Sequence, residues 1–415
     1  NLKIITSLLG SLFLFTTLHA EAGEKKPALY QESYRPQYHF TADQGFINDP
    51  NGLVFVNGMY HLFFQHERPG TRWGHATSKD LLHWTQRADA IVPLKGHMVF
   101  SGSAVVDENN TSGFQIGAAP PVVAVFTSWG EGQCLAYSND DGMTFTRYKG
   151  NPVLKLPGDE LKSWPLSSRD PHVMWDKERE RWVMVLYTNP DQRKDKSGSG
   201  FSIFMSPDLK QWKKQSHLKG FYVCPDVFRL PIEGEPRKTS WVAMDWGQYA
   251  IGEFDGATFT PKGETRKLDF GMNHYLSANQ SWKHLPNGRV IQICWLRGGK
   301  YPGMPFDQQL SFPTELTLRR IDKQILLCKN PIPEIRKLHC SNNTLENLTL
   351  KEGESRIIKD LSQSLDIDAS FKLEPDAEIS ISVLNQEIRV TRGHVQSSGR
   401  KGTLPGEPEQ QNIRI

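Results

Sequence analysis

Three aspartates stand beside prolines at the borders of apolar runs, and these residues are the best suited to chemistry. They are Asp49 before Pro50, Asp170 before Pro171, and Asp226 after Pro225. Pro50 restricts Asp49 to an extended backbone, which presents the carboxyl group at the edge of a strand. One such motif alone is more typical of an ordinary turn. Three together suit a shared pocket, and glycoside hydrolysis needs two carboxyl groups, one ionised and one protonated.

Aromatic residues accompany these motifs along the sequence. They are Phe46, Phe64, Trp73, Phe100, Trp129 and Tyr222. An aromatic ring covers the C–H face of a sugar, while Asp, Asn, Gln and Arg side chains bind its hydroxyl groups. Asp49 and Asp170 lack the surrounding His and Cys residues of a metal site, and no nucleotide-binding or serine-hydrolase motif occurs. The sequence therefore predicts a sugar-binding pocket that uses no metal and no cofactor.

Short strands must position these residues, because segments with a helical period are scarce. Apolar runs at 53–56 and 59–64 flank Asn57-Gly58, a pair typical of a tight β-hairpin turn. Runs at 181–187 and 240–244 are rich in aromatic and β-branched residues, as strands are. We therefore predict an all-β fold.

A weak repeat runs through the same region. The segment 78–84 (SKDLLHW) resembles 206–212 (SPDLKQW), and 138–145 and 254–259 are looser copies. Each copy is a polar turn that ends in an aromatic residue. The copies recur roughly every 50 to 70 residues, about the size of a four-stranded propeller blade. Loops from different blades meet at one end of a propeller, so this fold would bring distant acidic residues together.

The chain divides into three predicted parts. The apolar run 4–18 and the Ala20-Glu21-Ala22 motif indicate a signal peptide over 1–22, and hence a secreted or periplasmic protein. We expect the propeller over 32–325 and a hinge at 330–333. Strands at 370–373 and 379–384 indicate a β-sandwich over 334–415. Its polar end from Ser397 cannot close a core, so we expect this domain to be incomplete.

Composition excludes several classes of protein. The 415 residues include 49 Lys and Arg against 46 Asp and Glu, a net charge of +3, which argues against a nucleic-acid partner. The single apolar run argues against membrane association beyond the signal peptide. The five cysteines are widely spaced, so we interpret them as buried free thiols.

The sequence resembles glycoside hydrolase family 32, which contains invertases, inulinases, levanases and other β-fructosidases. The matching blocks run in order from about Tyr38 to Leu318: 48–52 (NDPNG), 65–66 (QH), 74–81 (GHATSKDL), 100–104 (FSGSA), 169–171 (RDP) and 224–226 (CPD). The resemblance implies a five-bladed β-propeller followed by a β-sandwich. It also implies hydrolysis of β-fructofuranosyl bonds in sucrose or fructans such as levan and inulin, with retention of configuration.

The resemblance assigns roles to individual residues. Asp49 matches the nucleophile that forms a covalent fructosyl-enzyme, and Asp170 matches the transition-state stabiliser, with Arg169 beside it. Asp226 matches a carboxylate next to the acid/base position. The residues that match the lining of the terminal fructose subsite are Asn48, Gln65, Trp73, Phe100 and Ser101.

One departure from the family affects catalysis directly. The family has Glu-Cys-Pro-Asp where this chain has Val223 before Cys224, and that Glu is the general acid/base. A valine cannot donate a proton, and positioned acid–base catalysis contributes about 10²–10⁴-fold to a rate. Three explanations stay open: a natural pseudoenzyme that binds fructans, a Glu-to-Val change in the sequence, or a substitute carboxyl group, of which Asp226 is nearest in sequence.

The predicted function is therefore an exported β-fructosidase, with activity impaired by Val223. The alternative is a fructan-binding pseudoenzyme without turnover. A propeller glycosidase that acts on arabinose or xylose is a third hypothesis, and the 48–52 block argues against it.

Overall fold

The structure is a computed structural model that describes residues 29–67, 71–161, 167–189, 198–270, 276–321, 323–358, 364–383, 385–403 and 410–414. The predicted signal peptide, 1–22, lies outside the described residues. The chain separates into two units, Asn1–Arg35 and Pro36–Ile415. In the first unit, Arg35 donates two hydrogen bonds to the Glu32 carboxylate, at 2.8 and 2.5 Å. All assigned strands belong to the second unit.

Antiparallel sheets follow one another in chain order. The first contains β1 (Gly45–Val56), β2 (Met59–His66), β3 (Arg72–Ser78) and β4 (Thr85–Ile91). The second contains β5 (Val99–Val106), β6 (Val122–Ser128), β7 (Gly132–Ser138) and β8 (Thr146–Arg147). The third contains β9 (Ser168–Asp176), β10 (Arg181–Thr188), β11 (Gly200–Ser206) and β12 (Lys213–Lys219).

The strands that follow form one ten-stranded sheet. It contains β13 (Asp226–Ile232), β14 (Glu235–Met244), β15 (Gln248–Phe254), β16 (Phe259–Pro261), β17 (Arg266–Lys267), β18 (Leu276–Trp282), β19 (Val290–Leu296), β21 (Gln309–Leu310), β22 (Thr314–Ile321) and β23 (Gln324–Pro331). A single bridge, Ile232 to Leu318, joins β13 to β22. Because this bridge merges what would be two blades, the predicted number of five blades stays a prediction.

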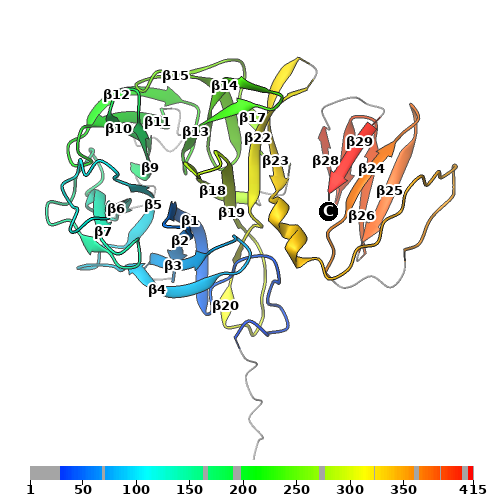
Figure 1. The fold of residues 1–415 in the computed structure, drawn as a ribbon, viewed down its shortest axis with the longest axis horizontal. Coiled ribbons are helices and arrows are strands. Elements are labelled where there is room, and N and C mark those ends of the chain that lie inside the picture. Colours follow the sequence, from blue (N-terminus) through cyan, green and yellow to red (C-terminus); the bar gives the residue numbers. More distant parts are fainter. Residues whose placement is uncertain are drawn as a thin grey trace, which may run out of the picture. The chain divides into compact units, whose positions relative to one another are not determined.

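The sheets are arranged around a ring (Figure 1), as the repeat predicted. Strand β5 contacts both β1 and β9, and β18 contacts both β1 and β13, so these strands lie innermost. The short strand β20 (Phe306–Asp307) pairs in parallel with β1 and joins the end of the ring to its beginning. The three aspartates that stand beside prolines, on β1, β9 and β13, therefore lie on innermost strands.

The local sequence signals are confirmed. Asn57 and Gly58 have φ angles of 46° and 77°, as the predicted hairpin turn between β1 and β2 requires. In the repeat, the Asp80 carboxylate accepts the N–H groups of Leu82 and His83, and Asp208 accepts those of Lys210 and Gln211. Both turns join the third strand of a sheet to the fourth, so the repeat marks the same corner in each sheet.

Clusters of apolar side chains fill the space between each sheet and the next. Phe63 and Trp73 of the first sheet pack with Phe126 of the second, for example, and Val185 of the third packs with Val227 of the next. Trp282 of β18 packs with Leu62 and Phe64 of β2, which closes the ring. Sheet packing of this kind holds the inner strands at fixed positions around the centre.

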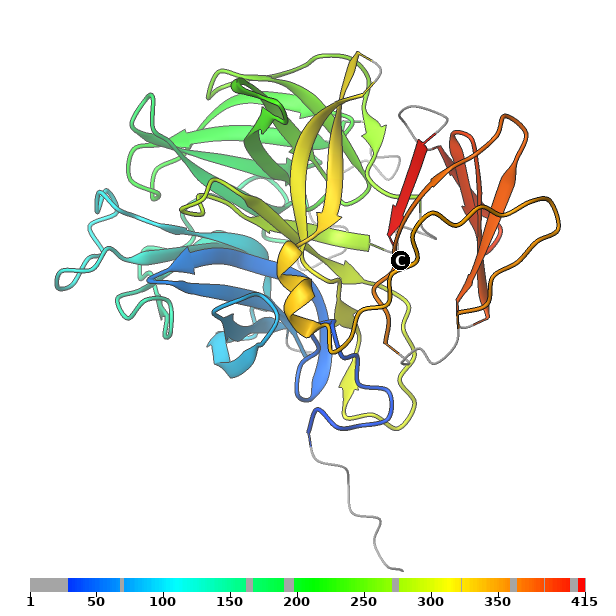
Figure 2. The same ribbon diagram turned by 45° about the vertical axis from the view of Figure 1, so that its right-hand side comes forward.

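The region after the ring has two features that the sequence did not predict, and the expected incomplete β-sandwich over 334–415 stays a prediction. Ile332 is fully buried in the core, and its N–H donates to the Pro313 carbonyl at 3.2 Å, so 330–333 is anchored rather than an open hinge. The 3₁₀ helix η1 (Pro333–Leu338) follows the β22–β23 hairpin (Figure 2). The polar end from Ser397 also forms strands, because its backbone groups pair across the sheet whatever its side chains are.

Two sheets make up the described part of the C-terminal region. One pairs β24 (Asp368–Lys372) with β29 (Gln410–Arg414). The other contains β25 (Glu378–Val383), β26 (Gln386–Thr391), β27 (His394–Ser397) and β28 (Arg400–Thr403). The expected strands at 370–373 and 379–384 correspond to β24 and β25. An all-β chain with a second β region after the propeller is thus confirmed.

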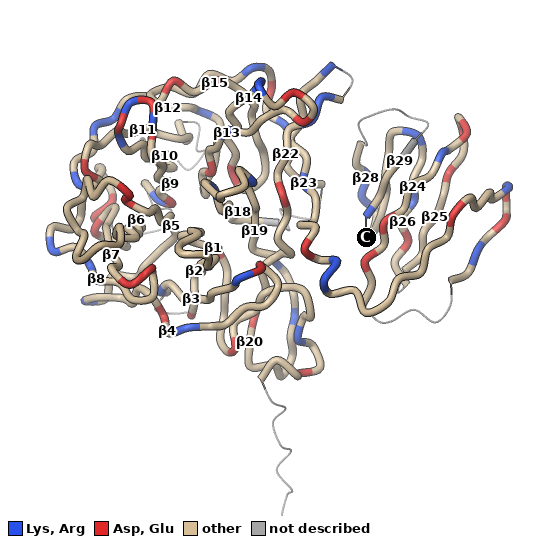
Figure 3. Tube along the Cα trace, viewed as in Figure 1, with Lys and Arg blue, Asp and Glu red and all other residues tan. Residues whose placement is uncertain are grey.

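The distribution of charged residues and the burial of most cysteines agree with the sequence predictions. Lys and Arg residues are interspersed with Asp and Glu along the trace (Figure 3), as a nearly balanced net charge would give. All five cysteines are free. Cys134, Cys224 and Cys294 are buried as predicted, whereas Cys328 is half-buried and Cys340 is exposed, which corrects the expectation for those two.

Candidate active site

Asp49 lies in a bulge of β1 and is held from β5. The pairing of β1 with β2 shifts register between Ile47 and Pro50, which leaves Asn48 and Asp49 outside the regular ladder. The Ser101 hydroxyl donates to Asp49 Oδ2 at 2.7 Å. Asp49 itself is half-buried. The strand geometry thus presents a fixed carboxylate at the inner edge of the ring, as the Asp–Pro motif predicted.

Asp170 lies on β9 and has an unusual backbone. Its φ angle is 60°, in the left-handed region that a non-glycine residue seldom adopts, although it precedes a proline. The side chain is buried, and Arg169 Nε lies 3.4 Å from Asp170 Oδ2. Burial raises the pKa of Asp170, and the Arg169 guanidinium opposes that shift. The sequence could not predict this conformation, because groups from other strands stabilise it.

Cys224 is bound to Asp170 by two hydrogen bonds. Its N–H donates to Asp170 Oδ2 at 3.2 Å, and its thiol donates to the same oxygen at 3.7 Å. The pKa of the Cys224 thiol is raised well above its usual value, first by burial and then by the negative charges of Asp170 and Asp49. Two carboxylates from strands far apart in sequence therefore act on one thiol.

Strand β5 connects the same two elements. Ser101 binds Asp49, and two residues further on the Ser103 hydroxyl donates to the Pro171 carbonyl at 2.9 Å. Ser101 lies where the pairing of β5 with β6 shifts register, between Val99 and Gly102. Strand β5 therefore binds both the β1 bulge that contains Asp49 and the first residues of β9, next to Asp170.

Val223 immediately precedes Cys224, which binds Asp170. It is buried at 5% exposure in an apolar cluster with Tyr187, Cys224 and Ala278. Its side chain offers no group that ionises. The neighbouring Tyr222 is half-buried, and its phenol oxygen accepts a hydrogen bond from Arg169 at 3.4 Å.

Asp226 has contacts of a different kind. It is fully buried, its Oδ1 pairs with Lys283 Nζ, and its Oδ2 accepts the Ser281 hydroxyl at 2.7 Å. His172 Nδ1 lies 3.6 Å from Oδ1, and burial lowers the pKa of this histidine well below its usual value. These contacts make Asp226 part of the buried support under the site. Its predicted contact with substrate stays a prediction.

The residues predicted to line the fructose subsite fall into two groups, half-buried residues and fully buried residues beneath them. Asn48 and Phe100 are half-buried, and the Phe100 ring meets Trp129 edge-on with centroids 6.1 Å apart. Trp73 is fully buried, and its indole N–H donates to the Phe100 carbonyl at 2.9 Å, so it supports Phe100 from below. Gln65 is buried, and its Nε2 atom finds no hydrogen-bond partner among the described residues. Phe64, one of the aromatics noted in the sequence, belongs to the core.

Other residues at the site were not expected from the sequence. Tyr187 lies at 5.4 Å from the Arg169 guanidinium carbon, and Trp295 meets Phe46 edge-on at 6.3 Å. The Arg297 guanidinium lies over both Trp246 and Trp295. Of these residues, Tyr187 could have been found from the sequence, because it lies in the predicted strand at 181–187. That strand, β10, pairs Tyr187 with Arg169 of β9.

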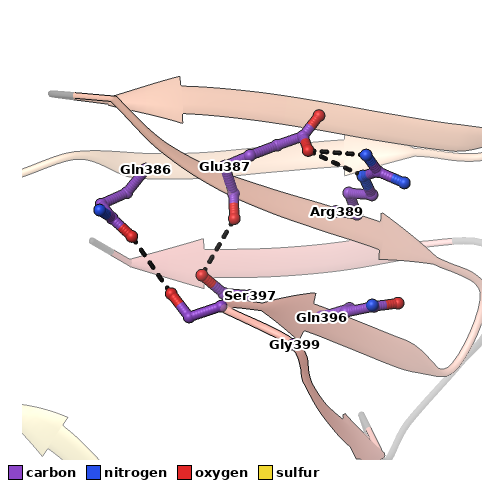
Figure 4. A pocket seen from close by; sticks show the side chains of 7 residues that line it. Gln386, Glu387, Arg389, Gln396, Ser397 and Gly399 are labelled. Carbon is purple, nitrogen blue, oxygen red and sulfur yellow. Dashed lines mark hydrogen bonds and ion pairs between the residues drawn. The ribbon is translucent and has the colours of Figure 1, made fainter.

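Two other kinds of site are absent from the described residues, a cluster of metal ligands and a membrane-spanning helix. Among the described residues, no group of three or more His, Cys, Asp or Glu side chains is placed to hold a metal ion. In the part of the chain that is described, no helix combines the length and apolar character needed to cross a membrane. A cavity of about 340 Å³ on β26 and β27 is lined by polar residues such as Gln386 and Gln396, and Glu387 pairs there with Arg389 (Figure 4). Its lining contains no aromatic ring.

Comparison with known proteins agrees with this geometry. Residues 39–331 match the glycosyl hydrolases family 32 N-terminal domain. The levanase of Bacillus subtilis is 35% identical over 417 residues, which cover 91% of this chain and 59% of the levanase. The extracellular exo-inulinase of Aspergillus niger is 33% identical over 76% of this chain and 68% of its own length. This chain thus spans less than two thirds of the levanase.

Comparison with solved structures also finds enzymes that act on fructose-containing sugars. The crystal structure of exo-inulinase from Aspergillus awamori superposes with a TM-score of 0.75 at 27% identity, covering 93% of this chain and 89% of that one. The β-fructofuranosidase of Schwanniomyces occidentalis, solved with fructosyl-erythritol, gives a TM-score of 0.71 at 27% identity over 91% and 83%. From the domain match, the relatives and the shared fold, this chain belongs to glycosyl hydrolase family 32.

Proposed function

We propose that this protein is an exported glycosidase of β-fructofuranosyl linkages in sucrose or fructans. The observation that carries the proposal is that β5 binds both aspartate segments: Ser101 donates to the Asp49 carboxylate, and Ser103 donates to the Pro171 carbonyl next to Asp170. Two carboxylates in one pocket are what glycoside chemistry requires. The relatives are named levanase, exo-inulinase and invertase, which supports a fructan or sucrose substrate.

In the proposed reaction, Asp49 is the nucleophile. Its carboxylate oxygen attacks the anomeric carbon of the terminal fructose as the bond to the leaving oxygen breaks, and a covalent fructosyl-enzyme forms. Water then displaces the Asp49 carboxylate and releases fructose, so that two inversions give retention overall. The Ser101 hydrogen bond holds the attacking carboxylate in place. Asp170 is the transition-state stabiliser, and Arg169 beside it favours the ionised form that accepts sugar hydroxyl protons.

The leaving oxygen needs a proton, and Val223 cannot supply one. Asp226 is an unsuitable substitute, because it is fully buried and engaged by Lys283 and Ser281. With a general acid absent, we expect turnover to be lower by about 10²–10⁴-fold. The apolar burial of Val223 therefore also supports the second candidate function, a fructan-binding protein without turnover.

Replacing Val223 separates these two functions. We expect Val223→Glu to raise fructose release from sucrose, inulin or levan by about 10²–10⁴-fold, because it restores a proton donor beside Asp170. Val223→Gln is the matched control, similar in size but unable to donate an acidic proton, and it should leave the rate at the starting level. A folded Val223→Glu variant that releases no fructose from any of the three would overturn the hydrolase proposal.

Binding can be measured whatever the turnover. We expect calorimetry to detect a fructose-terminated oligosaccharide on the unmodified chain, and Asp170→Ala to weaken that binding by removing the hydroxyl acceptor. If neither the unmodified chain nor Val223→Glu binds or cleaves the sugar, both candidate functions fail.

Export completes the proposal. The signal-peptide pattern over 1–22 and the extracellular naming of the Aspergillus niger relative both support action outside the cytoplasm.

A further inference from the structure

The backbone of Asp170 needs support from outside its own strand. A left-handed φ of 60° is strained at a non-glycine residue, so surrounding groups must hold it. The register of β9 with β10 is interrupted at this point, between the pairs His172–Val185 and Arg169–Tyr187. The ladder of its own sheet therefore does not fix Asp170.

The neighbouring sheet supplies the support through Thr127. The Asp170 N–H donates to Thr127 Oγ1 on β6 at 3.1 Å. The Thr127 hydroxyl in turn donates to Gln133 Oε1 at 2.8 Å, and Gln133 Nε2 donates to the Ser168 hydroxyl at 2.9 Å. Ser168 then donates to Asp159 Oδ1 at 2.7 Å. We name Thr127, Gln133, Ser168 and Asp159 the Thr127–Asp159 chain.

The direction of each hydrogen bond in the Thr127–Asp159 chain follows from the Asp159 carboxylate at its end. Asp159 also receives the Ser167 hydroxyl and the Leu156 N–H, both at 2.8 Å, so it acts as an acceptor throughout. Ser168 must therefore donate to Asp159 and accept from the Gln133 amide nitrogen. This orientation turns the amide oxygen toward Thr127, whose hydroxyl then donates there and keeps a lone pair for the Asp170 N–H.

Burial makes the chain effective. The exposed fractions are 3% for Thr127, 0% for Gln133, 2% for Ser168 and 5% for Asp159. Water does not compete for buried hydrogen bonds, and an unpaired member of the chain would lose its hydration without gaining a replacement bond. The chain thus has one low-energy arrangement, and Asp170 is attached to it by its backbone.

We propose that Thr127 and Gln133 are positioning residues for Asp170. They fix the left-handed backbone that points the Asp170 carboxylate toward Cys224 and Arg169, although neither residue is part of the family blocks noted in the sequence. This inference rests on the proposed function, in which Asp170 binds fructose hydroxyl groups.

The test is sugar binding by the full chain with a Thr127→Val substitution. Valine has nearly the same shape but neither accepts the Asp170 N–H nor donates to Gln133. We expect the Kd for a fructose-terminated trisaccharide, measured by calorimetry, to weaken about five- to tenfold. Thr127→Ser keeps the hydroxyl and should stay within about twofold of the unmodified chain. Gln133→Met breaks the chain one step away and should weaken binding about two- to fivefold.

Thr77→Val is the matched control for a purely structural effect. Thr77 is a buried strand threonine on β3 whose hydroxyl accepts one hydrogen bond, from Arg87 Nε at 3.1 Å. It should lower the melting temperature by as much as Thr127→Val but leave the Kd unchanged. If the unmodified chain binds and folded Thr127→Val and Gln133→Met bind equally well, the positioning inference is wrong and the proposed function stands. If the unmodified chain and Val223→Glu bind no sugar, the proposed function fails and the inference fails with it.

Discussion

At the scale of single residues, the two buried aspartates beside prolines have different roles that their motifs do not reveal. Asp170 faces Arg169 and Cys224, whereas Asp226 faces Lys283 and Ser281. Burial lowers the pKa of Lys283, and the Asp226 carboxylate opposes that shift. A buried ion pair contributes little net stability, but loss of one partner leaves an uncompensated charge in the core.

We therefore expect Lys283→Met to lower the free energy of unfolding by about 3–5 kcal/mol. The double variant Lys283→Met/Asp226→Asn should recover much of that loss, because no charge stays buried alone. Urea unfolding measures both. The control is Lys262→Met, which removes a lysine paired with Glu253 on the surface and should cost less than about 1 kcal/mol. A loss at Lys283 as small as at Lys262 would show that the pair is solvated.

At the scale of elements, β2 and β3 carry a buried histidine pair. His61 Nδ1 lies 3.0 Å from His75 Nε2, and the rings stack with centroids 5.2 Å apart. Burial is the main cause that lowers the pKa of His61 to about 4 and that of His75 to about 3. Arg87 lowers both further, while Asp141 and Asp140 oppose the shifts. Both rings are therefore neutral in the folded protein near neutral pH.

This pair predicts a loss of stability in mild acid. Above about pH 6.5 neither state is protonated, so the pair's stability is fully present. As the pH falls from 6.5 toward 4, the unfolded chain binds protons that the folded pair excludes. The free energy of unfolding then falls by up to about 1.4 kcal/mol per pH unit for each histidine.

Urea unfolding between pH 4.5 and 7 measures this dependence. We expect His75→Gln to reduce the slope by up to one proton, since it removes one titrating ring while keeping a polar partner for His61. The exposed His83→Gln variant is the control. An identical slope for His75→Gln and the unmodified chain would contradict the assignment.

At the scale of the whole ring, closure depends on contacts between its last and first sheets. Trp282 of β18 is fully buried, its indole N–H donates to the His61 carbonyl at 3.0 Å, and its ring stacks on Trp84 at 5.9 Å. The Gly45 N–H donates to the Pro305 carbonyl at 2.9 Å beside the β1–β20 pairing. Trp282 is therefore a fully buried side chain that links the two ends of the ring.

We expect Trp282→Ala to lower the free energy of unfolding by about 3–5 kcal/mol, through lost burial and the cavity left behind. Trp212→Ala is the control, because Trp212, in the Asp208 turn of the third sheet, likewise donates one indole hydrogen bond but is only half-buried. Its loss should be clearly smaller by calorimetric melting. Equal losses would mean that ring closure does not depend on Trp282.

The sequence by itself determined the local structure and the family. The Asn57-Gly58 hairpin, the repeated Asp turns and the strands at 181–187 and 240–244 all depend on residues within a few positions of one another, and the structure contains each of them. The short sequence blocks shared with the family likewise identify the residues of the candidate site.

Only the tertiary structure decided what each motif does. Asp170 and Asp226 each stand beside a proline, and their partners Cys224 and Ser281 lie more than 50 residues away in sequence. Trp73 was expected at the sugar and is buried beneath Phe100, because packing against Phe63 and Phe126 decides which face of β3 is covered. Burial and partner identity are set by how separate sheets meet around the ring, and that information is spread over the whole chain rather than held in any segment.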